Sequence, residues 1–261
     1  MNWASHVAPL LLTVALWWGS TALIARLIVG HPQHYSRLLQ WFTLIGLAGL
    51  GGIVLLREVT TSGSAMASLV AALAVWSWIE VTFLTGRITG VAARTAPATA
   101  PPSAGTLARA TAAIAAILWH ELLIIATVGV VALGTLGGAN QLALLVILLL
   151  WLMRSSAKLN LFLGVRNLGA GFLPPHLRHL LEFMRQRRMN LLMPVSLLLG
   201  SALCVHFAWL AATALSAHEA AAAAILATLA ALATLEHLLM ILPVPAEALW
   251  RWSLAPRQSS R

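Results

Sequence analysis

The sequence predicts an all-α membrane protein, a polytopic bundle of about seven transmembrane helices. Of its 261 residues, 60% are hydrophobic and only 9% are charged. The mean hydropathy of +0.89 exceeds what a soluble domain of this length carries. Its apolar residues form continuous runs, whereas membrane strands would alternate between apolar and polar positions. A single cysteine, Cys204, excludes a disulfide framework or a cysteine-based metal cluster.

Each apolar run approaches the roughly 20 helical residues that cross the hydrocarbon core of a bilayer. The expected spans are residues 7–29, 38–56, 65–85, 110–136, 141–153, 191–215 and 220–242. The fifth span is short and is expected to begin near the turn-forming residues 137–140. Because the first residues lack the basic segment of a signal peptide, we expect no cleaved leader. One transmembrane domain, residues 1–261, is the expected organisation.

Positive charge gathers in segments that would share one side of a seven-span bundle with its N-terminus outside and its C-terminus inside. These segments are residues 26–37, 86–109, 154–190 and 243–261. Of the 16 Lys and Arg residues, Arg57 alone falls on the other side, where it adjoins Glu58. The formal net charge of +9 therefore reports orientation in a lipid bilayer, and we expect no nucleic-acid partner.

Two expected cytoplasmic loops differ in character. Residues 95–105 are rich in Pro, Ala, Ser and Thr, a composition typical of a mobile linker. Residues 154–190 are strongly basic, and after Pro174-Pro175 they show apolar residues at helical spacing. These apolar positions are Leu177, Leu180, Leu181 and Met184. We expect an amphipathic helix on the membrane face, with its basic end against anionic lipid or an acidic partner.

Five ionisable residues stand out within the expected spans, where charged groups are costly. They are Glu80 in the third span, His120 and Glu121 in the fourth, and Glu236 and His237 in the seventh. All lie toward the same end of the bundle, so we expect these three helices to be neighbours and their carboxylates and imidazoles to share one layer. Such a cluster could contact a pigment, hold a metal ion or relay a proton, or it could only fix helix packing.

Tryptophan residues flank this layer at Trp76, Trp78 and Trp119. Flat aromatic side chains beside histidine could form a wall against a planar pigment, with an imidazole as axial ligand. These side chains could equally serve only to pack the core. His206, in the sixth span, is expected to be satisfied by packing, and Trp residues at the expected boundaries, Trp151 among them, are expected to anchor helices at the interface.

The segment Arg154–Leu168, with Phe172–Leu177, carries the most specific motif of the chain, RSSAKLNLFLGVRNL followed by FLPPHL. Shorter matches are Phe83–Gly86, Thr89-Gly90, His120-Glu121, Leu235–His237 and Leu249–Trp252. On these residues the chain resembles the photosynthetic complex assembly protein 2 family (PuhE-type) of phototrophic proteobacteria. The resemblance covers roughly residues 75–252. Two positions depart from the family pattern: Ile79 replaces a histidine, and Ala170-Gly171 replaces an acidic pair.

This resemblance implies a multi-pass protein of the bacterial inner membrane that assists assembly of photosynthetic reaction-centre and light-harvesting complexes. Its expected partners are subunits of those complexes or other assembly factors, and bacteriochlorophyll is the cofactor to consider before a metal ion. The alternative function is a membrane enzyme, metal-dependent or not, that acts on a tetrapyrrole or lipid through the intramembrane cluster. The cytoplasmic loop motif contains Arg154, Lys158 and Asn160, of which Lys158 and Asn160 are expected to bond helix termini or to hold the loop against the bundle. The alternative is that the basic loop only sets topology.

The charge distribution predicts that the turn at residues 137–140 lies outside, whereas the segment at residues 154–190 lies in the cytoplasm. Reporter domains fused after Asn140 and after Asn190 measure this topology in the living cell. The first fusion should give a periplasmic signal and the second a cytoplasmic one. The reverse pattern, or the same signal from both fusions, would contradict the predicted topology.

Overall fold

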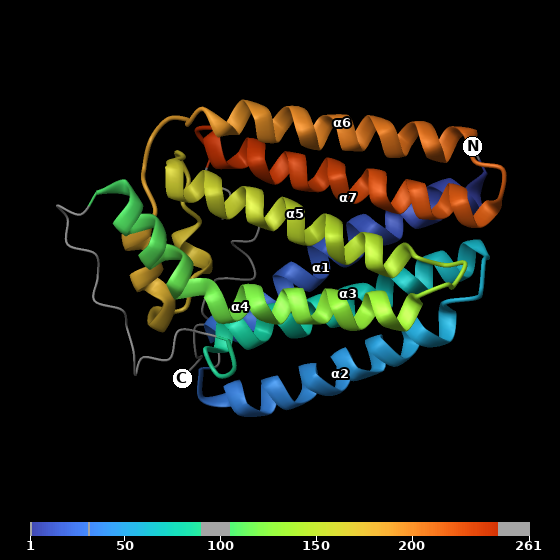
Figure 1. Ribbon diagram of the computed structural model, residues 1–261, viewed down its shortest axis with the longest axis horizontal. Coiled ribbons are helices and arrows are strands. Elements are labelled where there is room, and N and C mark those ends of the chain that lie inside the picture. The colour runs from blue at the N-terminus through green and yellow to red at the C-terminus, as the bar shows by residue number, and fades with distance from the viewer. Residues whose placement is uncertain (1, 31, 90–104, 245–261) are drawn as a thin grey trace, which may run out of the picture.

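The computed structural model describes residues 2–30, 32–89 and 105–244, and within them seven long helices confirm the predicted bundle (Figure 1). These helices are α1 (Ala8–Gly30), α2 (Tyr35–Leu56), α3 (Ser62–Thr85), α4 (Thr106–Thr135), α5 (Leu142–Leu163), α6 (Leu192–Thr213) and α7 (Ala217–Ile241). Each is long and apolar enough to cross a membrane. No strand occurs among the described residues. The Pro- and Ala-rich segment before Gly105 and the Leu249–Trp252 motif lie outside the described residues.

Shorter helical pieces complete the described chain. A π-helical turn, η1 (Trp3–Val7), leads into α1, and the 3-10 turn η2 (Pro32–His34) precedes α2. Two further 3-10 segments, η4 (Ala170–Phe172) and η5 (Pro175–Phe183), lie between α5 and α6. They gather at the end of the bundle where α5 and α7 finish and where α4 and α6 begin (Figure 1). We refer to this end as the basic end.

Helix α5 corrects one expected boundary, because it continues through Leu163 instead of ending at residue 153. Hydropathy placed the boundary at the first charges, Arg154 and Lys158, but both side chains meet carboxylates of neighbouring helices. The residues expected in a cytoplasmic loop motif, including Asn160, are therefore part of a membrane helix. Ion pairs inside the bundle lower the cost of placing these charges within a span.

The amphipathic segment also differs from the expectation. It forms the 3-10 helix η5 and not an α-helix. Its apolar side chains Leu177 and Leu180 are buried, and they pack with Phe83 of α3 and Ala116 of α4. The apolar face therefore packs against α3 and α4, and the expectation that it lies on the membrane face is wrong.

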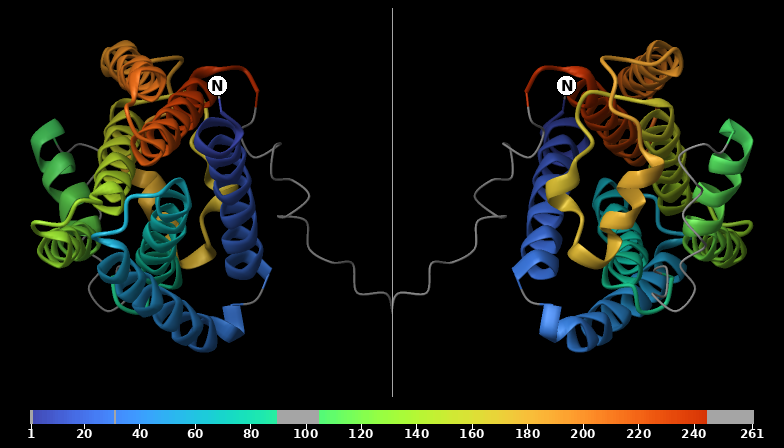
Figure 2. Two further views of the ribbon diagram at one scale, coloured as in Figure 1. Left: turned by 90° about the vertical axis from the view of Figure 1, so that its right-hand side faces the viewer. Right: turned by 90° about the vertical axis from the view of Figure 1, so that its left-hand side faces the viewer.

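Helix α3 occupies the middle of the bundle, surrounded by the other helices when viewed along the helix axes (Figure 2). It packs against α1, α2, α4, α5 and α7, and more of it is buried than of any other of the seven helices. Its side chains Leu69, Val75 and Ile79 are fully buried in the main core. Helix α6 lies at the periphery, where it packs chiefly against α7.

Close contact between α2 and α3 depends on glycine. A Cβ atom added to Gly49 would lie 2.7 Å from the carbonyl oxygen of Ala71, and one added to Gly46 would lie 2.9 Å from Cβ of Trp78. Both distances are shorter than van der Waals contact. Small residues at such positions let two membrane helices approach closely. Gly46 and Gly49 thus bring α2 against the central helix.

Asparagine side chains tie the helix ends together. At the end opposite the basic end, the Nδ2 atom of Asn140 donates hydrogen bonds to the carbonyl oxygens of Leu56 and Val59 and to the hydroxyl of Ser68. At the basic end, the Nδ2 atom of Asn167 donates to the carbonyl oxygen of Leu239 near the end of α7. Terminal carbonyl groups have no partner within their own helix, so these amides satisfy them.

The glycine contact predicts that Gly49→Ala destabilises the bundle by about 1–3 kcal/mol, because the new methyl group would overlap the backbone of α3. Gly51→Ala is the matched control, since nothing lies within 4 Å of a Cβ added there. The measurement is the free energy of unfolding of each purified variant in mixed micelles. Equal effects of the two substitutions would contradict the proposed close approach.

Candidate functional site

Two ion pairs connect α5 to its neighbours near the basic end. The Nη2 atom of Arg154 lies 2.7 Å from Oε2 of Glu80 on α3. One turn further along α5, the ammonium group of Lys158 pairs with Oε1 of Glu121 on α4. The two cations of α5 therefore face two carboxylates that belong to two different helices. All four groups are near enough to interact electrostatically, and their formal charges balance.

Glu121 has a second partner that the sequence analysis missed. The indole nitrogen Nε1 of Trp151 donates a 3.0 Å hydrogen bond to Oε2 of Glu121. Trp151 was expected to be an interfacial anchor, but α5 extends past it and places it inside the cluster. Both carboxylate oxygens of Glu121 thus accept hydrogen bonds, one from a cation and one from an indole.

His120 lies beside these pairs and is almost completely buried, with 1% of its surface exposed. The ring of Phe83 packs against it with the ring centroids 4.5 Å apart. Among the described residues, neither Nδ1 of His120 nor Oε1 of Glu80 has a hydrogen-bond partner. Both atoms are buried, and neither takes part in the two ion pairs.

His237 takes part in a separate polar chain that joins α7, α5 and α6. Its Nε2 atom lies 3.0 Å from the hydroxyl of Ser156, whose own partner is the hydroxyl of Ser196 on α6 at 2.9 Å. Asn160 donates from Nδ2 to the same Ser196 hydroxyl at 2.9 Å. Asn190 in turn donates to Oδ1 of Asn160 and accepts the first backbone N–H groups of α6. Asn190 therefore caps the start of α6, and Asn160 of α5 contacts both Asn190 and Ser196.

Glu236 lies on the side of α7 that faces α1. Its carboxylate accepts a hydrogen bond from Trp17 of α1, and it interacts electrostatically with Arg154. The side chain is exposed, unlike that of its neighbour His237. The adjacent residues thus face different surroundings, as residues about 100° apart on a helix must.

The structure therefore joins some of the expected site residues and separates others. Glu80, His120 and Glu121 form one cluster with Arg154, Lys158 and Trp151 of α5. Glu236 is near it through Arg154, whereas His237 belongs to the serine and asparagine chain. Helix α5 lies between α4 and α7 (Figure 1), so the expected close packing of the third, fourth and seventh spans holds for α3 with each of the others but not for α4 with α7.

The positions of these side chains determine which chemistry the cluster can perform. In the part of the chain that the structure describes, no three His, Cys, Asp or Glu side chains come together in a way that could hold a metal ion. Two carboxylates are already engaged by cations. The arrangement can bind helices to one another and can keep charge balanced in an apolar medium.

The expected aromatic wall is dispersed. Trp119 points outward and is 68% exposed, whereas the adjacent His120 is buried. Trp78 donates from Nε1 to the hydroxyl of Thr43 on α2, and Trp76 packs against the main core. The three indoles therefore do not line one surface together with an imidazole.

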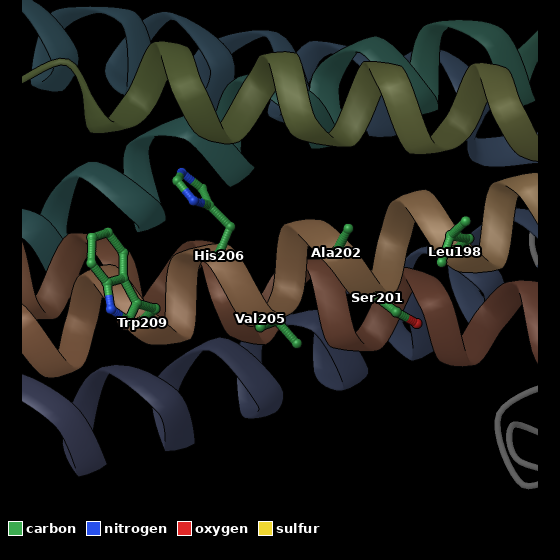
Figure 3. A pocket seen from close by; sticks show the side chains of 6 residues that line it. All are labelled: Leu198, Ser201, Ala202, Val205, His206 and Trp209. Carbon is green, nitrogen blue, oxygen red and sulfur yellow. The ribbon is translucent and has the colours of Figure 1, made fainter.

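His206 of α6 lies beside Trp209 in Figure 3. It is exposed on an open face of that helix. This face also carries Leu198, Ser201, Ala202, Val205 and Trp209. The expectation that packing satisfies His206 is wrong, because α6 is peripheral and this face of it has no neighbouring helix among the described residues.

Comparison with other proteins extends over nearly the whole bundle. A family model described as "Protein of unknown function (DUF3623)" matches residues 3–261. A protein of Rhodobacter capsulatus, named "Uncharacterized 30.4 kDa protein in puhA 5'region", is 33% identical over 252 residues, which cover 94% of this chain and 89% of that protein. No solved structure matches the chain significantly. The similarity is thus not confined to one helix pair or loop.

The ion pairs predict energetic coupling between α4 and α5. Lys158→Ala or Glu121→Ala alone should lower the free energy of unfolding by about 3 kcal/mol, because each leaves a partly buried charge without its partner. The double variant should lose less than the sum of the two, by at least about 1 kcal/mol. Unfolding of the three variants in mixed micelles measures this coupling.

The exposed pair Arg57–Glu58 provides the control for that measurement, since its atoms lie 3.3 Å apart on a turn. The same cycle there should give a coupling below about 1 kcal/mol. Strictly additive losses at Lys158 and Glu121 would show that their contact contributes nothing to stability.

Proposed function

Because this chain belongs to the DUF3623 family, whose description assigns no activity, we propose its function from its membrane architecture and from the gene neighbourhood of its relative. The proposal is that it acts in the bacterial inner membrane as an assembly factor for photosynthetic reaction-centre and light-harvesting complexes. On this view it belongs to the photosynthetic complex assembly proteins that the sequence motifs resemble.

The observation that carries the proposal is the name of the relative, which places that protein in the region 5' of puhA, a photosynthesis gene. Bacterial genes that act on one complex are commonly neighbours, and the identity covers most of both chains. Seven apolar helices give this chain a place in the membrane, where subunits of photosynthetic complexes would be met.

The geometry of the bundle supports a non-catalytic role. The charged side chains near the basic end bind one another across α3, α4 and α5, so they stabilise the scaffold. Apolar side chains on the outer faces of α2 and α6, such as Leu55 and Leu198, are exposed and can contact lipid or the helices of a partner.

Bacteriochlorophyll handling is the finer part of the proposal. Chlorophyll-type pigments contain a metal centre that accepts a neutral imidazole nitrogen, and histidine is the commonest such ligand. His206 offers that nitrogen on an open apolar face beside Trp209 (Figure 3). His120 does not, since it is enclosed by Phe83 and by the ion pairs.

The alternative is a membrane enzyme that acts on a tetrapyrrole or lipid through the intramembrane cluster. The unpartnered Nδ1 of His120 and Oε1 of Glu80 are the observation that favours it, because a proton-transfer site needs such atoms. The enclosure of both atoms favours the scaffold role instead.

The proposal predicts that a strain of a phototrophic bacterium lacking this gene accumulates less reaction-centre and light-harvesting complex, and that the wild-type chain restores it. Near-infrared absorption of isolated membranes measures the complexes, and transcript levels of their subunits serve as the control. Unchanged complex levels under phototrophic growth would contradict an assembly role.

The same strains distinguish the alternative. An enzyme of pigment synthesis would leave its tetrapyrrole substrate to accumulate, and a Glu80→Gln, His120→Gln chain would fail to remove it. An assembly factor would instead be captured with complex subunits when a tagged full-length chain is purified from phototrophic cells, and an absorption spectrum of that sample reports bound pigment.

A further inference from the structure

A group of three arginine residues at the basic end is not used by the ion pairs described above. Arg109 lies in the first turns of α4, whereas Arg185 and Arg187 follow η5. The guanidinium group of Arg109 is near enough to those of Arg185 and Arg187 to be repelled by both. In the described part of the chain, no carboxylate lies within ion-pair distance of any of the three. We call Arg109, Arg185 and Arg187 the arginine cluster.

Arg109 is held in place on two sides. Its Nη2 atom donates a 3.1 Å hydrogen bond to the carbonyl oxygen of Phe183, and its guanidinium lies 5.1 Å from the ring centroid of Phe162 on α5. Its Nη1 atom is buried and has no hydrogen-bond partner among the described residues. The guanidinium of Arg109 is thus fixed in place while part of its donor capacity has no acceptor among the described residues, and an anion is the acceptor that such a group binds most strongly.

Backbone pairing fixes the other two arginines. The N–H of Arg185 donates to the carbonyl oxygen of Leu161, the N–H of Val165 donates to that of Arg185, and the N–H of Arg187 donates to that of Val165. Residues two apart in such an extended segment point to the same side, so Arg185 and Arg187 are presented together.

Gly164 makes room for one of these side chains. It has a φ of +123°, and a Cβ atom added there would lie 2.9 Å from both Cγ and Cδ of Arg187. Only glycine suits that backbone conformation and that contact. The aliphatic stem of Arg187 therefore lies directly over the end of α5, with its charged group beyond it.

The helix that carries Arg109 adds positive potential. The N-terminus of an α-helix carries a partial positive charge, and Gly105, the N-cap of α4, has no side chain that could accept a hydrogen bond from the first turn. Three cations beside a helix start would destabilise one another unless an anion lies among them. Guanidinium groups bind phosphate through paired N–H donors.

Exposed apolar side chains adjoin the arginine cluster in the sequence. Leu107 is 79% exposed and precedes Arg109 by two residues, and Met189 and Leu191 are exposed just after Arg187. A phosphate that comes with acyl chains would suit both kinds of neighbour. A free phosphate would leave the apolar side chains without a partner.

We propose that the arginine cluster binds the phosphate group of an anionic phospholipid at the membrane surface. The lipid would join the start of α4 to the segment after η5 and to the end of α5, three parts of the chain that meet at the basic end (Figure 1). This site is independent of the assembly role proposed above.

Native mass spectrometry of the purified full chain, titrated with phosphatidylglycerol or phosphatidylcholine, tests the proposal. The wild-type chain should bind one phosphatidylglycerol more tightly than further copies and more tightly than phosphatidylcholine. Arg185→Gln and Arg187→Gln should each weaken that first binding step by about tenfold, through loss of charge-assisted hydrogen bonds. Arg187→Lys should weaken it less, because it keeps the charge but loses the paired donors.

Arg178→Gln is the matched control, since Arg178 lies exposed on η5 at the same end and its replacement removes the same charge. Its first binding step should stay within about fivefold of the wild type, the general effect of one surface charge. Equal weakening by all Gln variants would overturn the proposal in favour of unspecific surface charge.

Inorganic phosphate distinguishes the source of the anion. If phosphate alone binds the wild-type chain as tightly as phosphatidylglycerol, and if Arg187→Gln abolishes that binding, the ligand is a free phosphate and the lipid assignment is overturned. Helix content measured by circular dichroism must match the wild type in every variant that is compared.

Discussion

A charge without a partner is costly in hydrocarbon, and this constraint organises the bundle around α5. Arg154 and Lys158 stand one turn apart on that helix and meet Glu80 of α3 and Glu121 of α4. Each pair fixes both the distance and the rotation of two helices, because a charged group that turned away would lose its partner in a medium of low dielectric constant. The positions of α3, α4 and α5 therefore depend on one another, and α3 in turn supports α1, α2 and α7.

Hydropathy and charge were sufficient to predict the number of helices, but not the extent of α5 or the contents of the cluster. A window of apolar residues identifies a span by local composition, so it ended the fifth span at Arg154. The partners of Arg154 lie on helices far away in the sequence, and no local pattern reports them. Glu80 and Glu121 could be predicted as site residues because each is isolated within an apolar run. Arg154 and Lys158 come directly after an apolar run, so their charge was taken as a signal for membrane orientation.

The same reasoning explains two further differences. Trp151 was expected at the membrane interface, but α5 continues to Leu163, so Trp151 lies well inside the helix. The spacing of apolar residues was enough to predict the apolar face of η5. Whether that face meets lipid or protein depends on distant parts of the chain, and in this bundle it packs against Phe83 and Ala116. Conversely, the motif that carried the family resemblance includes Arg154, Lys158, Asn160 and Asn167. Their hydrogen bonds to other helices suit a segment that holds the bundle together.

The order of the paired helices along the chain bears on how the protein enters the membrane during synthesis. The ribosome releases α3 and α4 before α5, so both glutamates reach the bilayer ahead of the cations that will neutralise them. A carboxyl group can enter hydrocarbon as the uncharged acid, whereas arginine keeps its proton. The two carboxyl groups, which can stay uncharged until their partners arrive, are thus synthesised first. Helix α5 then enters the membrane when both are already in place. A chain with the opposite order would have to insert a guanidinium before its counter-charges, at a higher cost in free energy.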